Sequence, residues 1–318
     1  MILSTLRIVL SFAFTVIFAS LVLANDKLTV FVSIAPQKYF VQQIAKDLVD
    51  VKVMVLPGAD PHMYEPKPKQ MVAMSKAKLY FTIGIEFEKA NLGKIVSINP
   101  QIKVVNTDRG IKKISMAAYH HHDEEGEHHK EVEPPEEDDH RHEQGDSARE
   151  NDHHNHGGLD PHIWLSPPLV KIQAYTIMKA LQEIDPSHRA LYEGNFQRFV
   201  SRIDKLSTEL KAIFADKQGL QFMVFHPSWG YFAMAYGLRQ VPVQIEGKNP
   251  KPAQLKELIE HARGKKIKMI FVQPQFSAKS AQLVAKEIGG EVAFVDPLAE
   301  NWSANLREVA NKFKAALK

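Results

Sequence analysis

The 318-residue chain contains no cysteine. It therefore has no disulfide bond, no thiolate metal ligand and no cysteine that could carry a lipid at a processing site. Any transition-metal site in this protein must be built from imidazole and carboxylate groups. These groups also resist oxidation in an oxidising compartment.

The sequence also has no apolar run long enough for an ordinary membrane span. The run at residues 8–23 is about sixteen residues long, whereas a spanning helix needs roughly twenty. It follows Arg7 and ends at the small-residue junction Val22-Leu23-Ala24, a layout typical of a secretory signal peptide. We expect residues 1–24 to be removed after Ala24 and the mature protein to be periplasmic.

The formal net charge of +3 hides a strongly acidic tract at residues 120–156. This tract contains ten of the fifteen histidines, and fourteen Asp or Glu residues against three Lys or Arg residues. Because it has almost no apolar side chains to bury, we expect a loop without fixed structure. The basic residues elsewhere are spread along helical patterns as solvated faces, so we expect no nucleic-acid partner.

Common catalytic motifs are missing as well. The chain has no HExxH or HxHxDH pattern, no glycine-rich phosphate loop and no GxSxG elbow. A zinc hydrolase would need an open coordination position and a nearby base. Glu65, three residues after His62, is the candidate for that base.

The remaining sequence alternates strand and helix patterns, which predicts parallel sheets flanked by helices. In the first half we expect strands at 28–34, 51–56, 78–83 and 102–106, with helices at 36–49, 68–77 and 86–97. In the last third we expect strands at 220–225, 241–245, 267–273 and 291–295, with helices at 231–236, 252–263, 278–288 and 304–317.

Two helix patterns, each opened by proline, separate these halves at 167–184 and 186–215. A thirty-residue helix is roughly 45 Å long, enough to bridge two lobes. We therefore expect an N-terminal α/β lobe at 25–185, a linker helix at 186–215 and a C-terminal α/β lobe at 216–318.

Five histidines lie outside the acidic tract. His188 and His261 fall in polar helical patterns and are predicted to be surface residues. His62 and His162 each end an Asp-Pro-His triplet, and His226 directly follows a predicted strand. Asp296 also follows a strand.

Ligands of open parallel sheets bind at the carboxyl ends of the strands, where His62, His226 and Asp296 are expected. Three imidazoles and one carboxylate suit a borderline divalent ion such as zinc. Prolines beside these residues fix the backbone and reduce the entropy lost on binding. We predict one metal ion held by His62, His162, His226 and Asp296, with binding that weakens as the imidazoles protonate.

Several segments together resemble the metal-binding subunits of bacterial ABC uptake systems for zinc and manganese, and among them the ZnuA type. The segments are PGADPHMYEP (57–66), LDPHIWLSP (159–167), VFHPSWGYFAMAYGL (224–238), IEGKNPKPAQLKEL (245–258) and FVDPL (294–298). The His-rich insertion also lies where zinc members carry one.

This resemblance implies two lobes, each a mainly four-stranded parallel sheet flanked by helices, joined by one long rigid α-helix. It implies ligands at His62, His162 and His226, with Asp296 or water in the fourth position. Histidine at position 226 is similar to the zinc type, because manganese relatives carry a carboxylate there. It further implies a monomer that docks on the permease of an ABC transporter.

The prediction is thus a periplasmic zinc receptor that is not an enzyme. A manganese receptor of the same family, a zinc-dependent hydrolase and a metal buffer without a transporter are the alternatives. The tract at 120–156 either collects zinc weakly for the main site, reports zinc abundance, or is a tolerated solvated insertion.

Overall fold

The computed structural model describes residues 27–116, 158–244 and 248–317. The predicted signal peptide at 1–24 and the predicted loop at 120–156 lie outside the described residues. Within the described ranges, no helix combines the length and the apolar character needed to cross a membrane.

The N-terminal lobe is a parallel sheet of four strands in the order β2-β1-β3-β4. Its strands are β1 (Leu28–Val32), β2 (Val49–Val53), β3 (Leu79–Thr82) and β4 (Lys103–Asn106). Its helices are α2 (Ala35–Ala45), α3 (Pro68–Met74) and α4 (Glu86–Ile98), with a 3-10 turn η1 (Lys46–Leu48).

The C-terminal lobe repeats this topology, with the strand order β6-β5-β7-β8. Its strands are β5 (Gln221–Val224), β6 (Arg239–Pro242), β7 (Met269–Val272) and β8 (Glu291–Phe294). Its helices are α7 (Gly230–Ala235), α8 (Pro252–Gly264), α9 (Lys279–Glu287) and α10 (Trp302–Ala316). In both sheets the winding direction reverses beside the first strand, which creates a crevice at the strand ends.

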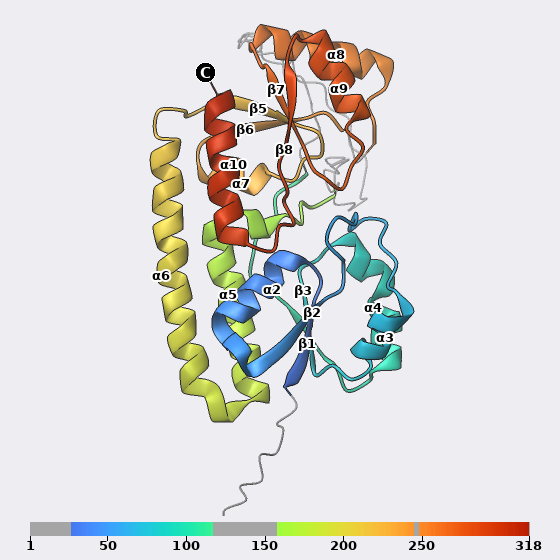
Figure 1. The fold of residues 1–318 in the computed structure, drawn as a ribbon, viewed down its shortest axis with the longest axis vertical. Coiled ribbons are helices and arrows are strands. Elements are labelled where there is room, and N and C mark those ends of the chain that lie inside the picture. The colour runs from blue at the N-terminus through green and yellow to red at the C-terminus, as the bar shows by residue number, and fades with distance from the viewer. Residues whose placement is uncertain (1–26, 117–157, 245–247, 318) are drawn as a thin grey trace, which may run out of the picture.

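Two antiparallel helices run along one side of the molecule and connect the lobes (Figure 1). They are α5 (Pro167–Ile184) and α6 (Arg189–Ile213), preceded by the 3-10 turns η2 (Ile163–Leu165) and η3 (Pro186–His188) respectively. The 25 residues of α6 span about 37 Å at 1.5 Å per residue. This helix packs on α5, on α2 of the first lobe and on α10 of the second.

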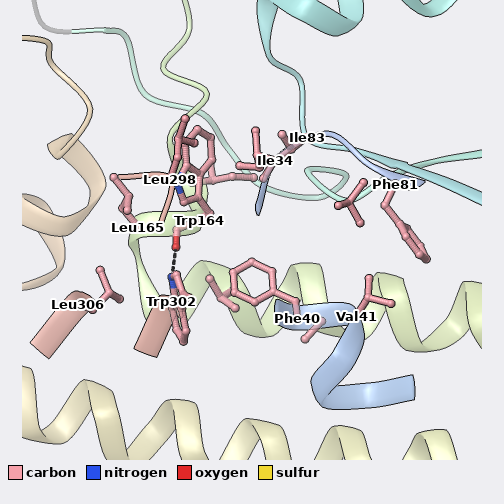
Figure 2. Close-up of a cluster of buried hydrophobic side chains, with 14 of the residues drawn as sticks. Ile34, Phe40, Val41, Phe81, Ile83, Trp164, Leu165, Leu298, Trp302 and Leu306 are labelled. Carbon is pink, nitrogen blue, oxygen red and sulfur yellow. Dashed lines mark hydrogen bonds between the residues drawn. The ribbon is translucent and has the colours of Figure 1, made fainter. Parts of the chain in front are cut away.

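One hydrophobic core continues across the two lobes. It joins side chains of β1, β3, α2, α5 and α6 to side chains of β5 and α10, while a smaller cluster lies beneath α8 and α9. At the junction, the indole Nε1 of Trp302 donates to the carbonyl oxygen of Trp164 at 2.7 Å, next to Phe40 and Leu298 (Figure 2). The predicted fold class, two lobes with four-stranded parallel sheets joined by a long helix, is confirmed.

Several predicted boundaries differ from the structure. The helix expected at 36–49 ends at Ala45 because Lys46 adopts a φ of 52°, which is outside the helical region. Strand β2 consequently begins at Val49, two residues earlier than expected, and pairs in register with β1. The helix expected at 186–215 begins only at Arg189, because Asp185 accepts hydrogen bonds from Ser187 and Tyr192 and holds a separate 3-10 turn.

Candidate metal centre

His62 lies in the loop that leaves the carboxyl end of β2. Its backbone N–H donates to Oδ1 of Asp60 at 2.9 Å, so the Asp-Pro-His triplet forms a tight local turn. The residue is exposed overall, yet its ring lines a pocket between the lobes. The loop therefore presents one imidazole from the N-terminal lobe.

His162 repeats this local turn in a buried setting, just before η2. Its backbone N–H donates to Oδ1 of Asp160 at 2.8 Å, and its ring Nδ1 lies 2.7 Å from the same oxygen. A carboxylate only accepts, so Nδ1 carries the proton and the Nε2 lone pair is left for a metal ion. Tyr231 of α7 donates to the carbonyl oxygen of Asp160 at 2.9 Å, which ties this turn to the C-terminal lobe.

His226 comes directly after β5 and is held by amide side chains. Its N–H donates to Oε1 of Gln273 at 3.2 Å, and its carbonyl accepts from Nε2 of Gln273 at 2.7 Å. Ring Nδ1 lies 3.0 Å from Oε1 of Gln244, and the ring stacks on Phe276 with centroids 4.8 Å apart. Nε2 is buried and has no hydrogen-bond partner among the described residues. With Nδ1 as donor to Gln244, Nε2 has the lone pair that a metal requires.

The three rings approach one another. The centroid of His226 lies 5.2 Å from that of His62 and 5.3 Å from that of His162. Two imidazoles on one tetrahedral zinc, with bonds of about 2.0–2.1 Å, would have centroids roughly 5 Å apart. Within the described ranges, however, no three His, Cys, Asp or Glu side chains are arranged to hold a metal ion as they stand. The rings thus share a pocket but do not yet form a closed shell.

The electrostatics favour a neutral imidazole at His226 and at His62. The pKa of His226 is lowered to about 3, first by burial and then by the neighbouring His162 and His62, while the hydrogen bond to Gln244 opposes the shift. Desolvation also lowers the pKa of His62; the carboxylates of Asp60 and Glu86 oppose this change and His162 adds to it. Although the His62 loop is exposed, its ring enters the pocket, which explains the desolvation. Neutral imidazole is the form that binds metals.

Apolar side chains and prolines form most of the pocket wall. Besides the three histidines, the lining residues are Pro61, Ile85, Pro161, Trp164, Gln275, Phe276, Pro297 and Leu298. The Trp164 ring lies 5.1 Å from that of His162, and its Nε1 donates to the carbonyl oxygen of Pro297 at 2.7 Å. Such a wall restricts solvent access and strengthens the bond between imidazole and metal.

Asp296, the predicted fourth ligand, follows β8 as expected but is not among the residues that line the pocket. Its Oδ1 accepts from Nε2 of Gln275 at 2.8 Å and from the N–H of Leu298 at 2.9 Å. Asp296 is thus joined to the pocket lining through Gln275 and Leu298. Glu65 is exposed and also outside the pocket lining.

The two histidines predicted to be surface residues lie away from the pocket. His188 is bonded to Asp185 through Nδ1 at 2.7 Å, and His261 is half-buried with Nε2 2.7 Å from Oε1 of Gln221.

The sequence prediction missed three amides of the site, namely Gln244 and Gln273, which bond to His226, and Gln275, which lines the same pocket. Gln273 and Gln275 stand at the end of β7 and Gln244 follows β6, so the rule that pointed to His226 and Asp296 would also have found them. Glutamine is common in loops, and only the fold brings these three amides to one site.

Known proteins match this chain over most of its length. The family described as "ZnuA: Zinc-uptake complex component A periplasmic" matches residues 30–316. The chain is 30% identical over 325 residues to the high-affinity zinc uptake system protein ZnuA of Brucella abortus, which covers 97% of each chain. It is 26% identical to the ZnuA protein of Bacillus subtilis, covering 86% of this chain and 79% of that protein.

Solved structures are similar over the same length. A protein described as "Crystal structure of ZnuA" has a TM-score of 0.78 and 40% identity, covering 92% of this chain and 100% of that chain. A manganese-bound periplasmic metal-binding protein of Candidatus Liberibacter asiaticus has a TM-score of 0.72 at 23% identity, covering 92% of this chain and 100% of that chain, and shares the fold.

Proposed function

Because this chain belongs to the ZnuA family of periplasmic zinc-uptake components, we propose that it is a high-affinity zinc receptor that delivers Zn²⁺ to the permease of an ABC importer. The family consists of metal-binding receptors for uptake and not of enzymes. The zinc-hydrolase alternative is therefore set aside. The signal peptide at 1–24, cut after Ala24, is part of the proposal.

The observation that carries this proposal is the approach of three imidazoles from two lobes. His62 comes from the N-terminal sheet, His226 from the C-terminal sheet, and His162 from the segment between the sheets that leads into α5. We propose that Nε2 of His162 and Nε2 of His226 bind the ion and that His62, on its exposed loop, completes the set with a small shift. We propose that Asp296, predicted as the fourth ligand, takes part in the same centre through its bond to Gln275.

The donor set favours zinc over manganese as the cargo. Imidazole suits zinc, whereas manganese is better served by carboxylate, carbonyl and water oxygens. No carboxylate lines the pocket among the described residues. The alternative function is a manganese receptor, and a direct comparison of zinc and manganese binding tests it.

The test is a crystal structure of the metal-free protein soaked with zinc, with anomalous data recorded on both sides of the zinc edge. We expect one strong anomalous peak bounded by His62, His162 and His226 at about 2.0–2.1 Å from a nitrogen of each. A matched soak with manganese should give a weaker peak at the manganese edge. A strong zinc peak elsewhere would refute this centre, and a stronger manganese peak would favour the manganese receptor.

A further inference from the structure

Among the described residues, Gln275 is the one amide side chain in the lining of the proposed zinc pocket. It follows β7 and donates from Nε2 to Oδ1 of Asp296 at 2.8 Å. A carboxylate only accepts hydrogen bonds, so the nitrogen of the amide must face Asp296 and the oxygen must be the other terminal atom. The orientation of the amide is therefore fixed by chemistry.

Asp296 is itself held in place. The N–H of Leu298 donates to its Oδ1 at 2.9 Å, and Asn305 of α10 donates to its carbonyl oxygen at 2.7 Å. The carboxylate thus has a fixed position from which it orients Gln275. Its role in the centre is to position the amide.

The amide oxygen Oε1 of Gln275 is buried and accepts no hydrogen bond from any described residue. A buried acceptor without a donor is costly, and native proteins rarely keep one without a reason. His226 lines the same pocket, and its Nε2 is also buried without a partner among the described residues. Two unpartnered polar atoms in one small apolar pocket indicate a ligand that satisfies both.

We propose that Oε1 of Gln275 accepts a hydrogen bond from a water molecule that occupies the fourth position of the bound zinc ion, with Asp296 as the positioning residue. This inference rests on the proposed function. A water is favoured over direct coordination because protein ligands of zinc are imidazole, thiolate and carboxylate groups and not neutral amides. The water donates one hydrogen bond to Oε1 of Gln275, and the oxygen of the water completes a tetrahedral shell around the ion.

This arrangement also contributes to selectivity. Manganese prefers oxygen ligands, carboxylates among them, and in this chain a neutral amide lies between the pocket and the carboxylate of Asp296. Gln275 thus keeps the negative charge one hydrogen bond away from the ion. The expected consequence is a larger preference for zinc than a directly coordinating carboxylate would give.

The first experiment replaces Gln275→Met, which keeps the length of the side chain and removes both polar atoms. Zinc affinity is measured by competition with a chelator, and the visible absorption of bound Co²⁺ reports on the coordination shell. We expect zinc binding to weaken about ten- to a hundredfold and the cobalt bands to shift. The matched control is Gln282→Met, at an exposed position on α9 of the same lobe. An unchanged affinity with an unchanged cobalt spectrum would overturn the inference.

The second experiment exchanges the two groups in a Gln275→Glu, Asp296→Asn double variant. The new amide at 296 can donate to the new carboxylate at 275, so the hydrogen bond is kept while a charge moves to the pocket. We expect the ratio of zinc affinity to manganese affinity to fall at least tenfold. If the ratio stays at the wild-type value, Gln275 does not contribute to selectivity.

The outcomes separate this inference from the proposed function. A wild-type protein without a tight zinc site would refute the proposed function itself. A tight site that is lost in His162→Ala but unchanged in Gln275→Met would refute only the role of Gln275. A zinc-loaded crystal structure with the amide oxygen bonded directly to the ion would overturn the water-mediated contact.

Discussion

At the scale of single residues, the partner of each imidazole determines which of its nitrogens is free. Asp160 holds Nδ1 of His162 with a carboxylate, whereas Gln244 holds Nδ1 of His226 with a neutral amide. Both partners leave Nε2 free for the proposed metal ion, but only the carboxylate adds negative charge next to its imidazole. His162 is therefore expected to bind the metal ion more strongly than His226 does.

The variant Asp160→Asn tests this role. An amide in place of the buried carboxylate still accepts from the ring but no longer adds negative charge, so we expect zinc affinity to fall about ten- to a hundredfold. Titration calorimetry with zinc, in the presence of a competing chelator, measures this change. Asp204→Asn, at an exposed position paired with Lys171, is the control and should bind as the wild type does. Equal affinities in all three proteins would show that Asp160 acts only on the backbone turn.

The pH dependence of the metal-free protein follows from His226. Its pKa is about 3 in the folded state and about 6.5 in an unfolded chain, so below pH 6.5 the unfolded chain binds more protons. The contribution of neutral His226 to the free energy of unfolding is complete above about pH 6.5 and is lost as the pH falls toward 3. Urea unfolding between pH 7 and 4 should therefore show a steeper loss of stability for the wild type than for His226→Gln. Parallel curves would contradict the buried, neutral state of this histidine.

At the scale of helices and strands, hydrophobic periodicity predicted every strand of both sheets, because buried parallel strands are continuous apolar runs bounded by proline and glycine. The boundaries were less well predicted. The end of α2 depends on the positive φ of Lys46, and the start of α6 depends on side-chain bonds of Asp185. Neither is visible in a pattern of apolar residues.

The three histidines that line the pocket were also predictable from local sequence. The repeated Asp-Pro-His and the strand-end positions pointed to His62, His162 and His226, since local chain geometry carries that information. The contact between Asp296 and Gln275 could not be predicted, because it joins the ends of two neighbouring strands in the folded sheet.

The packing of α6 gives a prediction about stability. Phe199 is 1% exposed and its ring centroid lies 6.0 Å from those of Tyr39 and Phe40. We expect Phe199→Ala to lower the free energy of unfolding by about 3–5 kcal/mol, as measured by urea denaturation. Leu191 on the same helix is 44% exposed. We expect Leu191→Ala to change the free energy of unfolding by less than about 0.5 kcal/mol. Similar losses in both variants would contradict the packing described.

At the scale of the whole molecule, one core spans both lobes through α5, α6 and α10. His162 is tied to the C-terminal lobe through Tyr231, Trp164 and Pro297, while His62 lies on an exposed loop of the other lobe. In the proposed centre, the frame therefore fixes His162 and His226 before zinc arrives, and His62 then closes on the ion. This preorganisation reduces the entropy lost on binding.

The acidic, His-rich tract gives a prediction at this scale. If the tract collects zinc only weakly, deletion of residues 120–156 should remove several weak sites and leave the tight one, because no ligand of the proposed centre lies within it. Zinc titration of the full-length and deleted proteins counts both classes of site. Loss of the tight site on deletion would show that the tract takes part in the main centre.

The most direct test of the central claim is the stoichiometry and affinity of zinc, measured by chelator competition on the mature protein, on His162→Ala and on His188→Ala as a control. We expect one tight site in the mature protein and in the control, and only weak binding in His162→Ala. A tight site that survives in His162→Ala would mean that the ion binds elsewhere, and would contradict the zinc centre proposed between the two lobes.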